Sequence, residues 1–170
     1  MKAPKVSVLI PTYNYAHILD VTIQSVLAQT FTDFELIIVD NCSTDNTVEV
    51  VQKYLNDSRV SFYRNDRNLG LTGNWNRCLE LAKGEYLKYL CADDKLHRQI
   101  LEKYIPIMDS HPQVSIISCH RQEFDETGLK KKVVHPPFIG LKDGRDVIYE
   151  MVQHDQNYLG DPTRPMLRRS

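Results

Sequence analysis

Two adjacent carboxylates close an apolar stretch near the middle of the chain. The segment YLKYLCADDK, residues 86–95, ends its apolar run at Cys91 and continues into Asp93 and Asp94. Adjacent acids repel each other and lose hydration when partly buried, so they need a positive partner or separate tasks. Hard oxygen ligands suit Mg or Mn better than zinc. Asp94 and Asp93 are therefore candidate ligands for a Mg or Mn ion.

The composition is that of one globular domain with no bias towards a polyanionic or lipid partner. The 170 residues suffice to bury a core, and 42% hydrophobic with 25% charged residues is an ordinary balance. A net charge of -1 creates no field that favours nucleic acid, and no apolar run approaches a membrane span. The opening segment MKAPKVSVLIPTYN has an apolar run too short for a signal peptide.

The cysteines and histidines follow no disulfide or zinc pattern. The six histidines lack zinc spacing, and no CxxC pair occurs among Cys42, Cys78, Cys91 and Cys119. We interpret these four as reduced thiols in the core or at strand ends, which indicates a cytoplasmic protein.

The elements that must position the two acids alternate along residues 1–120. Apolar runs without polar alternation predict strands buried on both faces, and apolar residues at helical spacing predict helices between them. The expected strands are 6–11, 34–40, 60–64, 85–91 and 114–120, and the expected helices are 14–29, 43–55, 71–82 and 97–112. A hairpin around 127–128 and a short helix over 141–153 follow. This order predicts an α/β fold, with a Rossmann-like, mostly parallel central sheet flanked by helices.

Apolar spacing also predicts which helical residues face the core. Val48, Val51 and Leu55 share one face of the second helix. The buried stripe expected on the third helix consists of Leu71, Trp75, Cys78, Leu79 and Ala82. Trp75 is accordingly interpreted as a core residue rather than a platform for a sugar ring.

Polar residues gather where the predicted strands end, which is the edge at which doubly wound sheets bind ligands. They are Pro11-Thr12-Tyr13-Asn14, Asp40-Asn41 with Ser43, Asn65-Asp66-Arg67-Asn68, and Asp93-Asp94. No GxGxxG fingerprint and no phosphate loop follow the first strand, so a dinucleotide cofactor is not expected. Taken singly, Asn14 and Asn68 are equally consistent with a helix start and a turn, and Arg67 with a solvated loop arginine.

The order and spacing of these residues resemble those of the family 2 glycosyltransferases, which have the GT-A fold. The likeness lies in VSVLIPTYNYAHILDVTIQSVLAQTFTDFELIIVDNCSTDNT and in NLGLTGNWNRCLELAKGEYLKYLCADD, and it continues weakly to YLGDPTRPMLRRS. The resemblance implies inverting, metal-dependent transfer of a sugar from a nucleotide-diphosphate donor, expected to be a UDP-sugar. The implied acceptor is a saccharide or a lipid-linked molecule in cell-surface polysaccharide synthesis, at or near the inner face of the membrane.

The same resemblance implies roles for individual residues. The nucleotide pocket would be lined by Pro11, Thr12, Tyr13, Asn14 and Asn68. Asp40 would accept hydrogen bonds from a uracil-type base. Asp93 would contact the ribose or the metal, and Asp94 would hold the metal that bridges the diphosphate.

Two features depart from the family pattern. The family often reads Asp-Ala-Asp-Asp where this chain has Cys91-Ala92-Asp93-Asp94. A thiol is a poor Mg ligand, so Cys91 is expected to be a packed strand residue. The family's general base lies downstream of a segment like GDPTRPMLRRS, and neither Asp155 nor Asp161 matches it, so the catalytic base is unassigned.

We therefore expect one GT-A domain over 1–170, truncated at the carboxyl end, with a nucleotide-binding core in 1–120 and the start of an acceptor part in 121–170. Apolar surface left uncovered by this truncation would favour a homo-oligomer. Two alternatives remain open. One is a nucleotide-binding domain without transfer activity. The other is a nucleotidyltransferase, although PTYNYAH lacks that class's glycine-rich, basic loop.

Overall fold

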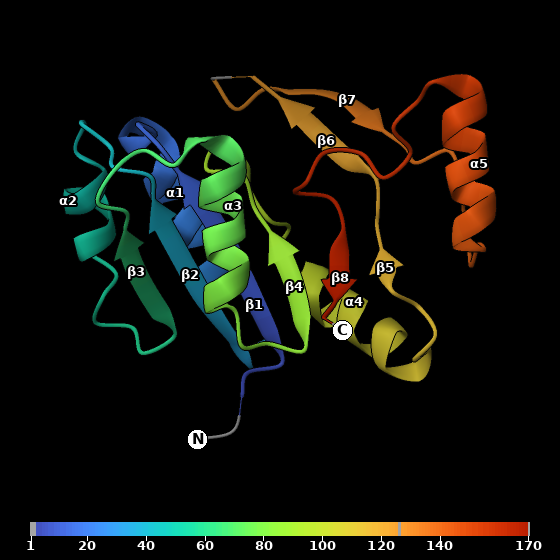
Figure 1. Cartoon of the computed structure of the whole chain (residues 1–170), viewed down its shortest axis with the longest axis horizontal. Helices are drawn as coiled ribbons and strands as arrows, with labels where there is room; N and C mark the ends of the chain where they lie inside the picture. The colour runs from blue at the N-terminus through green and yellow to red at the C-terminus, as the bar shows by residue number, and fades with distance from the viewer. Residues whose placement is uncertain (1–2, 126, 170) are drawn as a thin grey trace.

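The computed structural model describes residues 3–125 and 127–169 and consists of alternating strands and helices followed by a hairpin and a further helix (Figure 1). The strands are β1 Val6–Thr12, β2 Phe34–Asp40, β3 Val60–Arg64, β4 Tyr86–Tyr89, β5 Ile116–Ile117, β6 Arg121–Phe124, β7 Lys130–Val134 and β8 Met166–Arg168. The helices are α1 Ala16–Leu27, α2 Thr47–Gln52, α3 Gly70–Leu81, α4 Ile100–Ser110 and α5 Gly144–His154.

The described strands form a central sheet in the order β3-β2-β1-β4-β8-β5 and a separate β6-β7 hairpin. β1 pairs in parallel with β2 and β4, and β2 pairs in parallel with β3. β8 runs antiparallel between β4 and β5. The predicted mostly parallel sheet is confirmed. β3 lies at one edge of this sheet, where it pairs with β2 and has no described strand on its other side.

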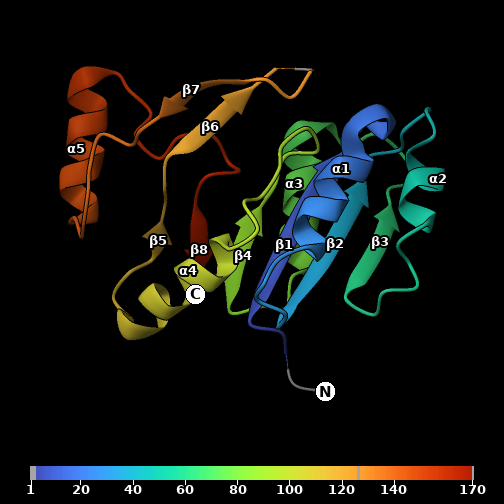
Figure 2. The ribbon, with the colours of Figure 1, turned by 180° about the vertical axis from the view of Figure 1, so that it is seen from behind.

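Helices cover both faces of the sheet, which explains the continuous apolar runs of the inner strands. Val8 and Ile10 of β1 pack in one cluster with residues of α1, α2 and α4, whereas Leu9 packs with Cys78 and Trp75 of α3 on the opposite face. Figures 1 and 2 show α3 in front of the sheet and α1 behind it. Trp75 stacks on Tyr89, with ring centroids 4.3 Å apart, and packs against the core as predicted, although its side chain is only partly buried.

Two helical predictions are wrong in part. On α3, Leu71 is 77% exposed and Leu79 is 40% exposed, while the polar Asn74 is buried with Cys78. Asn74 and Cys78, which lie four residues apart, are the buried side chains of α3 and face the sheet. The side-chain amide of Asn74 faces it because backbone carbonyls of the sheet accept its hydrogen bonds. α2 ends at Gln52, so Leu55 lies beyond the helix and is exposed.

The carboxyl-terminal strands also differ from expectation. The fifth strand was expected over 114–120, but β5 contains only Ile116–Ile117 because its one partner, β8, is itself three residues long. β8 was not predicted, since a strand this short carries no measurable alternation. It begins directly after Pro165, which cannot donate to the ladder.

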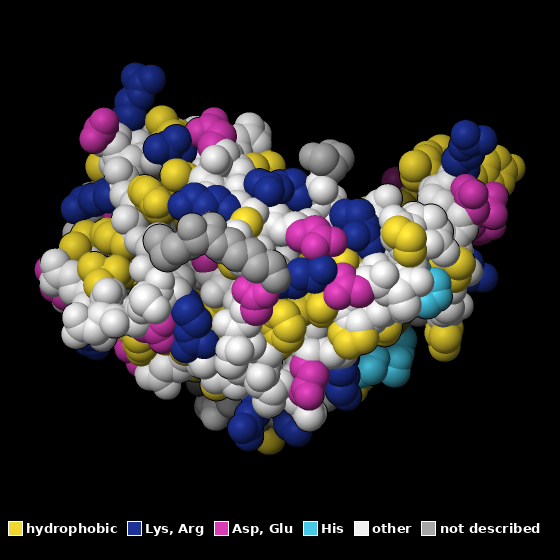
Figure 3. Space-filling view, turned by 90° about the horizontal axis from the view of Figure 1, so that it is seen from below, with side chains coloured by type: hydrophobic (Ala, Val, Ile, Leu, Met, Phe, Trp, Pro, Cys, Tyr) yellow, Lys and Arg dark blue, Asp and Glu magenta, His cyan; other side chains and the backbone are white. Residues whose placement is uncertain are grey.

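The hairpin and α5 lie beyond the sheet (Figures 1 and 2). β6 and β7 form the predicted hairpin around 127–128, and α5 matches the predicted short helix. No α5 residue is buried, and Ile148, Tyr149 and Val152 are each more than 60% exposed. Apolar side chains gather at the right-hand end of Figure 3, the end that α5 occupies in Figure 1. Within the described residues, no helix combines the length and apolarity of a membrane span.

Substituting alanine at Gly84 is expected to destabilise the sheet strongly. A Cβ at this position would lie 2.4 Å from the backbone nitrogen of Ser7 and 2.7 Å from the carbonyl carbon of Val6, neither of which can move away. We expect Gly84→Ala to reduce the free energy of unfolding by about 3 kcal/mol. Gly144→Ala is the matched control, because a Cβ there meets nothing within 4 Å. Equal unfolding midpoints in urea for the two variants would contradict this packing.

Candidate active site

The carboxyl ends of β1, β2 and β4 meet at one edge of the sheet and bring together most of the predicted site residues. Thr12 at the end of β1 lies opposite Asp40 at the end of β2. Asp40 in turn lies opposite Arg64 of β3. The loop after β4 carries Asp93 and Asp94 to the same edge because β4 runs parallel to β1.

Asp40 is fully buried and holds the loop that follows β2. Its Oδ1 accepts hydrogen bonds from the Ser43 backbone N–H at 3.0 Å and from the Ser43 hydroxyl. Arg64 Nε lies 3.3 Å from Oδ2, close enough for an ion pair, although Oδ2 accepts no hydrogen bond. The carboxylate of Asp40 is thus shielded from solvent and positions Ser43 at the edge of the sheet.

Asn14 joins the loop after β1 to the loop after β2. Its backbone N–H donates to Ser43 Oγ at 2.9 Å, and its side-chain Oδ1 accepts from the Thr44 N–H at 2.8 Å. Asn14 has φ 60°, a left-handed conformation that asparagine tolerates better than most residues. Pro11 and Thr12 are buried beneath this junction, whereas Tyr13 is 42% exposed beside it.

Four asparagines form a network beside the same edge. Asn41 Nδ2 donates to Asn68 Oδ1 at 2.8 Å, and Asn65 Nδ2 donates to Asn41 Oδ1 at 3.1 Å and to Asn74 Oδ1 at 2.9 Å. Asn74 Nδ2 completes the network by donating to the Val39 carbonyl at 3.1 Å. Apolar spacing does not point to Asn74, because its side chain is polar. The signal that could identify it is an amide side chain that lies within the buried face of the helix.

Substituting leucine at Asn74 is expected to weaken nucleotide binding. The change removes a buried donor and a buried acceptor, which leaves Asn65 Nδ2 and the Val39 carbonyl each short of a partner. Losses of this kind lower the free energy of unfolding by about 2 kcal/mol. Because the network holds the loops beside this edge, we also expect UDP to bind more weakly. Asn76→Leu, on the exposed side of the same helix, is the matched control in calorimetric titrations. An unchanged affinity in Asn74→Leu would separate this network from the site.

The acids after β4 lie in a turn that also contains Cys91. The Asp94 N–H donates to the Cys91 carbonyl at 3.0 Å, which closes the turn. Thr163 connects both ends, because its Oγ1 donates to Asp94 Oδ2 at 2.6 Å and accepts from the Cys91 N–H at 3.0 Å. Burial raises the pKa of Asp94, and the neighbouring charge of Asp93 raises it further, against the hydrogen bond from Thr163.

The expectation that Cys91 is a packed strand residue is wrong. β4 ends at Tyr89, and Cys91 lies in the following turn with its side chain only partly buried. Its Sγ lies within 4.8 Å of carboxylate oxygens of both Asp93 and Asp94. The apolar run in the sequence continues beyond the end of β4 to Cys91. The position of the turn therefore could not be predicted from the pattern of apolar residues.

Lys88 ties the carboxyl-terminal segment to β4. Its side chain is almost fully buried, and Nζ donates to the Arg164 carbonyl at 3.1 Å, to the Pro165 carbonyl at 3.2 Å and to the Thr163 carbonyl. Burial lowers the pKa of Lys88 to about 8. Since Thr163 holds Asp94, the lysine indirectly positions that acid.

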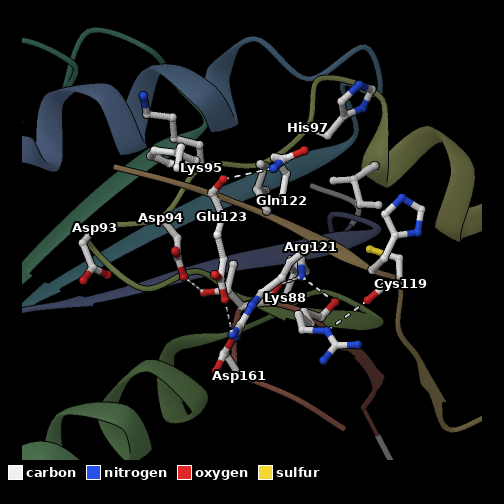
Figure 4. Close-up of a pocket in the computed structure, with 16 residues that line it drawn as sticks. Lys88, Asp93, Asp94, Lys95, His97, Cys119, Arg121, Gln122, Glu123 and Asp161 are labelled. Atoms are coloured by element: carbon white, nitrogen blue, oxygen red, sulfur yellow. Dashed lines mark hydrogen bonds and ion pairs between the residues drawn. The ribbon is translucent and has the colours of Figure 1, made fainter. Parts of the chain in front are cut away.

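A cavity of about 580 Å³ opens beside the acids, under the β6-β7 hairpin. Figure 4 shows Asp94 beside Glu123 and Arg121 at this cavity, with Asp93 at its margin. Arg121 pairs with Asp161 and with Glu123, the latter at 3.0 Å. Asp161 therefore lines the cavity as an ion-pair partner, and Asp155 lies away from it at the end of α5.

The donor set at Cys91, Asp93 and Asp94 fits a divalent cation. The three candidate ligand atoms lie within 4.8 Å of one another, and two of the three residues supply hard carboxylate oxygens. Both acids carry a like charge at adjacent positions, and a cation would relieve their repulsion. The residues present can therefore hold the metal that the fold family implies.

The mostly parallel sheet, with two acids at its carboxyl edge beside a cavity, matches the GT-A fold of solved glycosyltransferase structures. The sequence profile of Glycosyl transferase family 2 matches residues 7–167, and the chain belongs to this family. Its resemblance to family 2 glycosyltransferases and the expected fold are confirmed.

Three known proteins illustrate the relationship. The putative teichuronic acid biosynthesis glycosyltransferase TuaG of Bacillus subtilis is 40% identical over 62% of this chain and 42% of its own length. The crystal structure of Staphylococcus aureus TarS 1-349 in complex with UDP-GlcNAc covers 75% of this chain and 37% of that one, with 28% identity and a TM-score of 0.67. The mannosyltransferase PcManGT of Pyrobaculum calidifontis, in complex with GDP-Man and Mn²⁺, covers 70% and 36%, with 25% identity and a TM-score of 0.63. The chain spans about half the length of the curated relatives that align with most of it.

Proposed function

We propose that this protein transfers a sugar, with inversion, from a UDP-sugar to a saccharide or lipid-linked acceptor in a metal-dependent reaction of cell-surface polysaccharide synthesis. The observation that carries the proposal is the Cys91-Asp93-Asp94 cluster, which lies at the carboxyl edge of the sheet beside the cavity. Membership of family 2 and the UDP-GlcNAc complex of TarS support the donor class, and the Mn²⁺ complex of PcManGT supports the cofactor, Mg or Mn.

The nucleotide would lie across the ends of β1 and β2. Tyr13 is exposed there and offers a ring for stacking, and Asn14 and Asn68 lie in the flanking loops. The buried Pro11 and Thr12 would form the floor beneath the nucleotide. Asp40 would act on the base through Ser43, whose position it determines.

The diphosphate and sugar would extend towards the cavity. Asp94 and Asp93 would hold the cation, and the exposed Asp93 is also placed to accept from a ribose hydroxyl. A bound divalent ion supplies positive charge to the departing diphosphate. Thr163 keeps Asp94 in place for this role, and strand β6 lines the cavity beside it.

The acceptor would enter from residues 121–170, which we propose as the start of the acceptor part beside a nucleotide-binding core in 1–120. The exposed apolar residues of α5 are a surface through which the domain would form a homo-oligomer or contact a membrane from the cytoplasmic side. TuaG's name places that relative in polymer synthesis, which supports a polysaccharide acceptor.

A nucleotide-binding domain without transfer activity is the second candidate function. Glu123 and Asp161, which line the cavity, are both paired with Arg121, so neither is free to take a proton from an acceptor. Asp93 and Asp94 are assigned to the cation. No carboxylate that lines the cavity is therefore assigned as the general base.

Calorimetric titration of UDP with and without Mn²⁺ tests the proposal. Binding that requires Mn²⁺ and is stronger for UDP than for GDP or TDP is the expected result. Transfer is then followed as UDP release from UDP-glucose and UDP-GlcNAc with saccharide acceptors. Metal-dependent binding without release would favour the second candidate, and no binding of any nucleotide would contradict both.

A further inference from the structure

We propose that Cys91 is a third ligand of the divalent cation and that this site selects thiophilic transition ions such as Co²⁺ over Mg²⁺. The inference rests on the proposed function, since it concerns the same metal site. A donor set that includes the Cys91 sulfur differs from the family pattern Asp-Ala-Asp-Asp, in which this position is often an aspartate and all donor atoms are oxygens.

The geometry brings the sulfur to the acids. The Cys91 Sγ and carboxylate oxygens of Asp93 and Asp94 lie within 4.8 Å of one another. Two ligand atoms bound at about 2.0 to 2.3 Å from one ion lie at most about 4.6 Å apart, and three evenly spaced around it lie at most about 4.0 Å apart. A shift of under about an ångström therefore brings three atoms that lie within 4.8 Å of one another to a spacing at which they share an ion.

The backbone holds the thiol in this place. The hydrogen bond from the Asp94 N–H to the Cys91 carbonyl closes a turn that puts both residues at the same edge. Thr163 then fixes the Cys91 backbone through the amide N–H and fixes Asp94 through its carboxylate. The positions of Cys91, Asp93 and Asp94 therefore depend on Thr163, which lies in the segment before β8, as well as on the turn itself.

The surroundings of Cys91 differ from those of Cys78, which packs in the apolar core. Cys78 is fully buried in the core between α3 and the sheet. Cys91 is partly buried and borders the site, where a packing role would equally be met by alanine or valine. A side chain that is both accessible and surrounded by two carboxylates is suited to ligation.

The chemistry determines the metal preference. Thiolate is a soft ligand that binds transition ions well and Mg²⁺ poorly, whereas carboxylates accept both. On coordination the thiol proton leaves to solvent, and the thiolate adds a third negative charge to the ion's shell. Mg²⁺ gains little from that sulfur, so the mixed donor set favours a transition ion such as Co²⁺ over Mg²⁺.

The test is Co²⁺ absorption of the full chain in the presence of UDP. Coordination by Cys91 gives a thiolate-to-cobalt charge-transfer band in the near ultraviolet. We expect Cys91→Ser to lose this band, and Cys119→Ser, which changes a partly buried thiol that lines the cavity, to keep it. Because loss of even an outer partner weakens metal binding about 10- to 100-fold, Cys91→Ser should bind Co²⁺ at least about tenfold more weakly.

A third variant tests selectivity. Cys91→Asp restores an all-oxygen donor set, so its affinity for Mg²⁺ relative to Co²⁺ should rise at least about tenfold over that of the wild type. A wild-type protein that binds Co²⁺ through Asp94 without the band, or a band that survives in Cys91→Ser, would overturn the inference and leave the proposed function standing. Failure of the wild type to bind any cation with UDP would overturn both.

Discussion

Alanine at Asp94 is expected to abolish metal-dependent UDP binding. Asp94 supplies one of the two carboxylates of the candidate cation site, and it is the one fixed by Thr163 at 2.6 Å. Removal of a direct ligand should weaken Mn²⁺-dependent UDP affinity at least about 100-fold. Calorimetric titration of UDP with Mn²⁺ measures the loss, and Asp94→Asn tests whether the charge or the shape is responsible.

The fold should not suffer from this change. Burial raises the pKa of Asp94, so its ionised carboxylate contributes unfavourably to the stability of the folded protein. We therefore expect the melting temperature of Asp94→Ala to equal or exceed that of the wild type. Asp146→Ala, in the exposed first turn of α5, is the matched control and should retain binding. Full Mn²⁺-dependent affinity in Asp94→Ala would place the cation elsewhere.

Methionine at Lys88 is expected to reduce both stability and binding. The change leaves the carbonyls of Thr163, Arg164 and Pro165 without their shared donor in a buried setting. We expect a loss of about 3 kcal/mol in the free energy of unfolding. The loosened segment would release Thr163 from Asp94, so Mn²⁺-dependent UDP binding should weaken as well.

The pH dependence of this loss distinguishes Lys88 from a neutral structural residue. The folded-state pKa of about 8 lies below the ordinary 10.5, so the unfolded chain binds the extra proton between these values. The stability contributed by Lys88 therefore rises from pH 8 towards pH 10.5, and the gap to Lys88→Met should widen there. Lys103→Met, at an exposed position of α4, is the control. A gap that is constant with pH would contradict the buried, perturbed lysine.

The parallel half of the fold was predictable because its strands are buried on both faces. Each inner strand therefore appears in the sequence as an apolar run, and the helices between the strands show apolar residues at helical spacing. The prediction was weaker at α3, where Asn74 faces the sheet because it pairs with the Val39 carbonyl and not because it is apolar. Polar burial of this kind has no periodic signature.

The two acids of the candidate site could be predicted from the sequence, but the contacts that hold them in place could not. Asp93 and Asp94 follow a strand whose direction alone carries them to the ligand edge. Thr163 reaches them from β8's preceding segment, 69 residues further along the chain, and such a contact depends on how the antiparallel β8 inserts beside β4. The place of Cys91 beside the acids likewise depends on where β4 ends.

Nuclear magnetic resonance of the backbone amides tests the central claim most directly, namely that a UDP moiety binds at the carboxyl edge of the sheet with its cation at the acids after β4. UDP with Mg²⁺ should shift the amides of Tyr13, Asn14 and Ser43, and replacing Mg²⁺ by Mn²⁺ should broaden those around Asp94. Shifts confined to α5 or to the β6-β7 hairpin, or broadening remote from Asp94, would contradict the account.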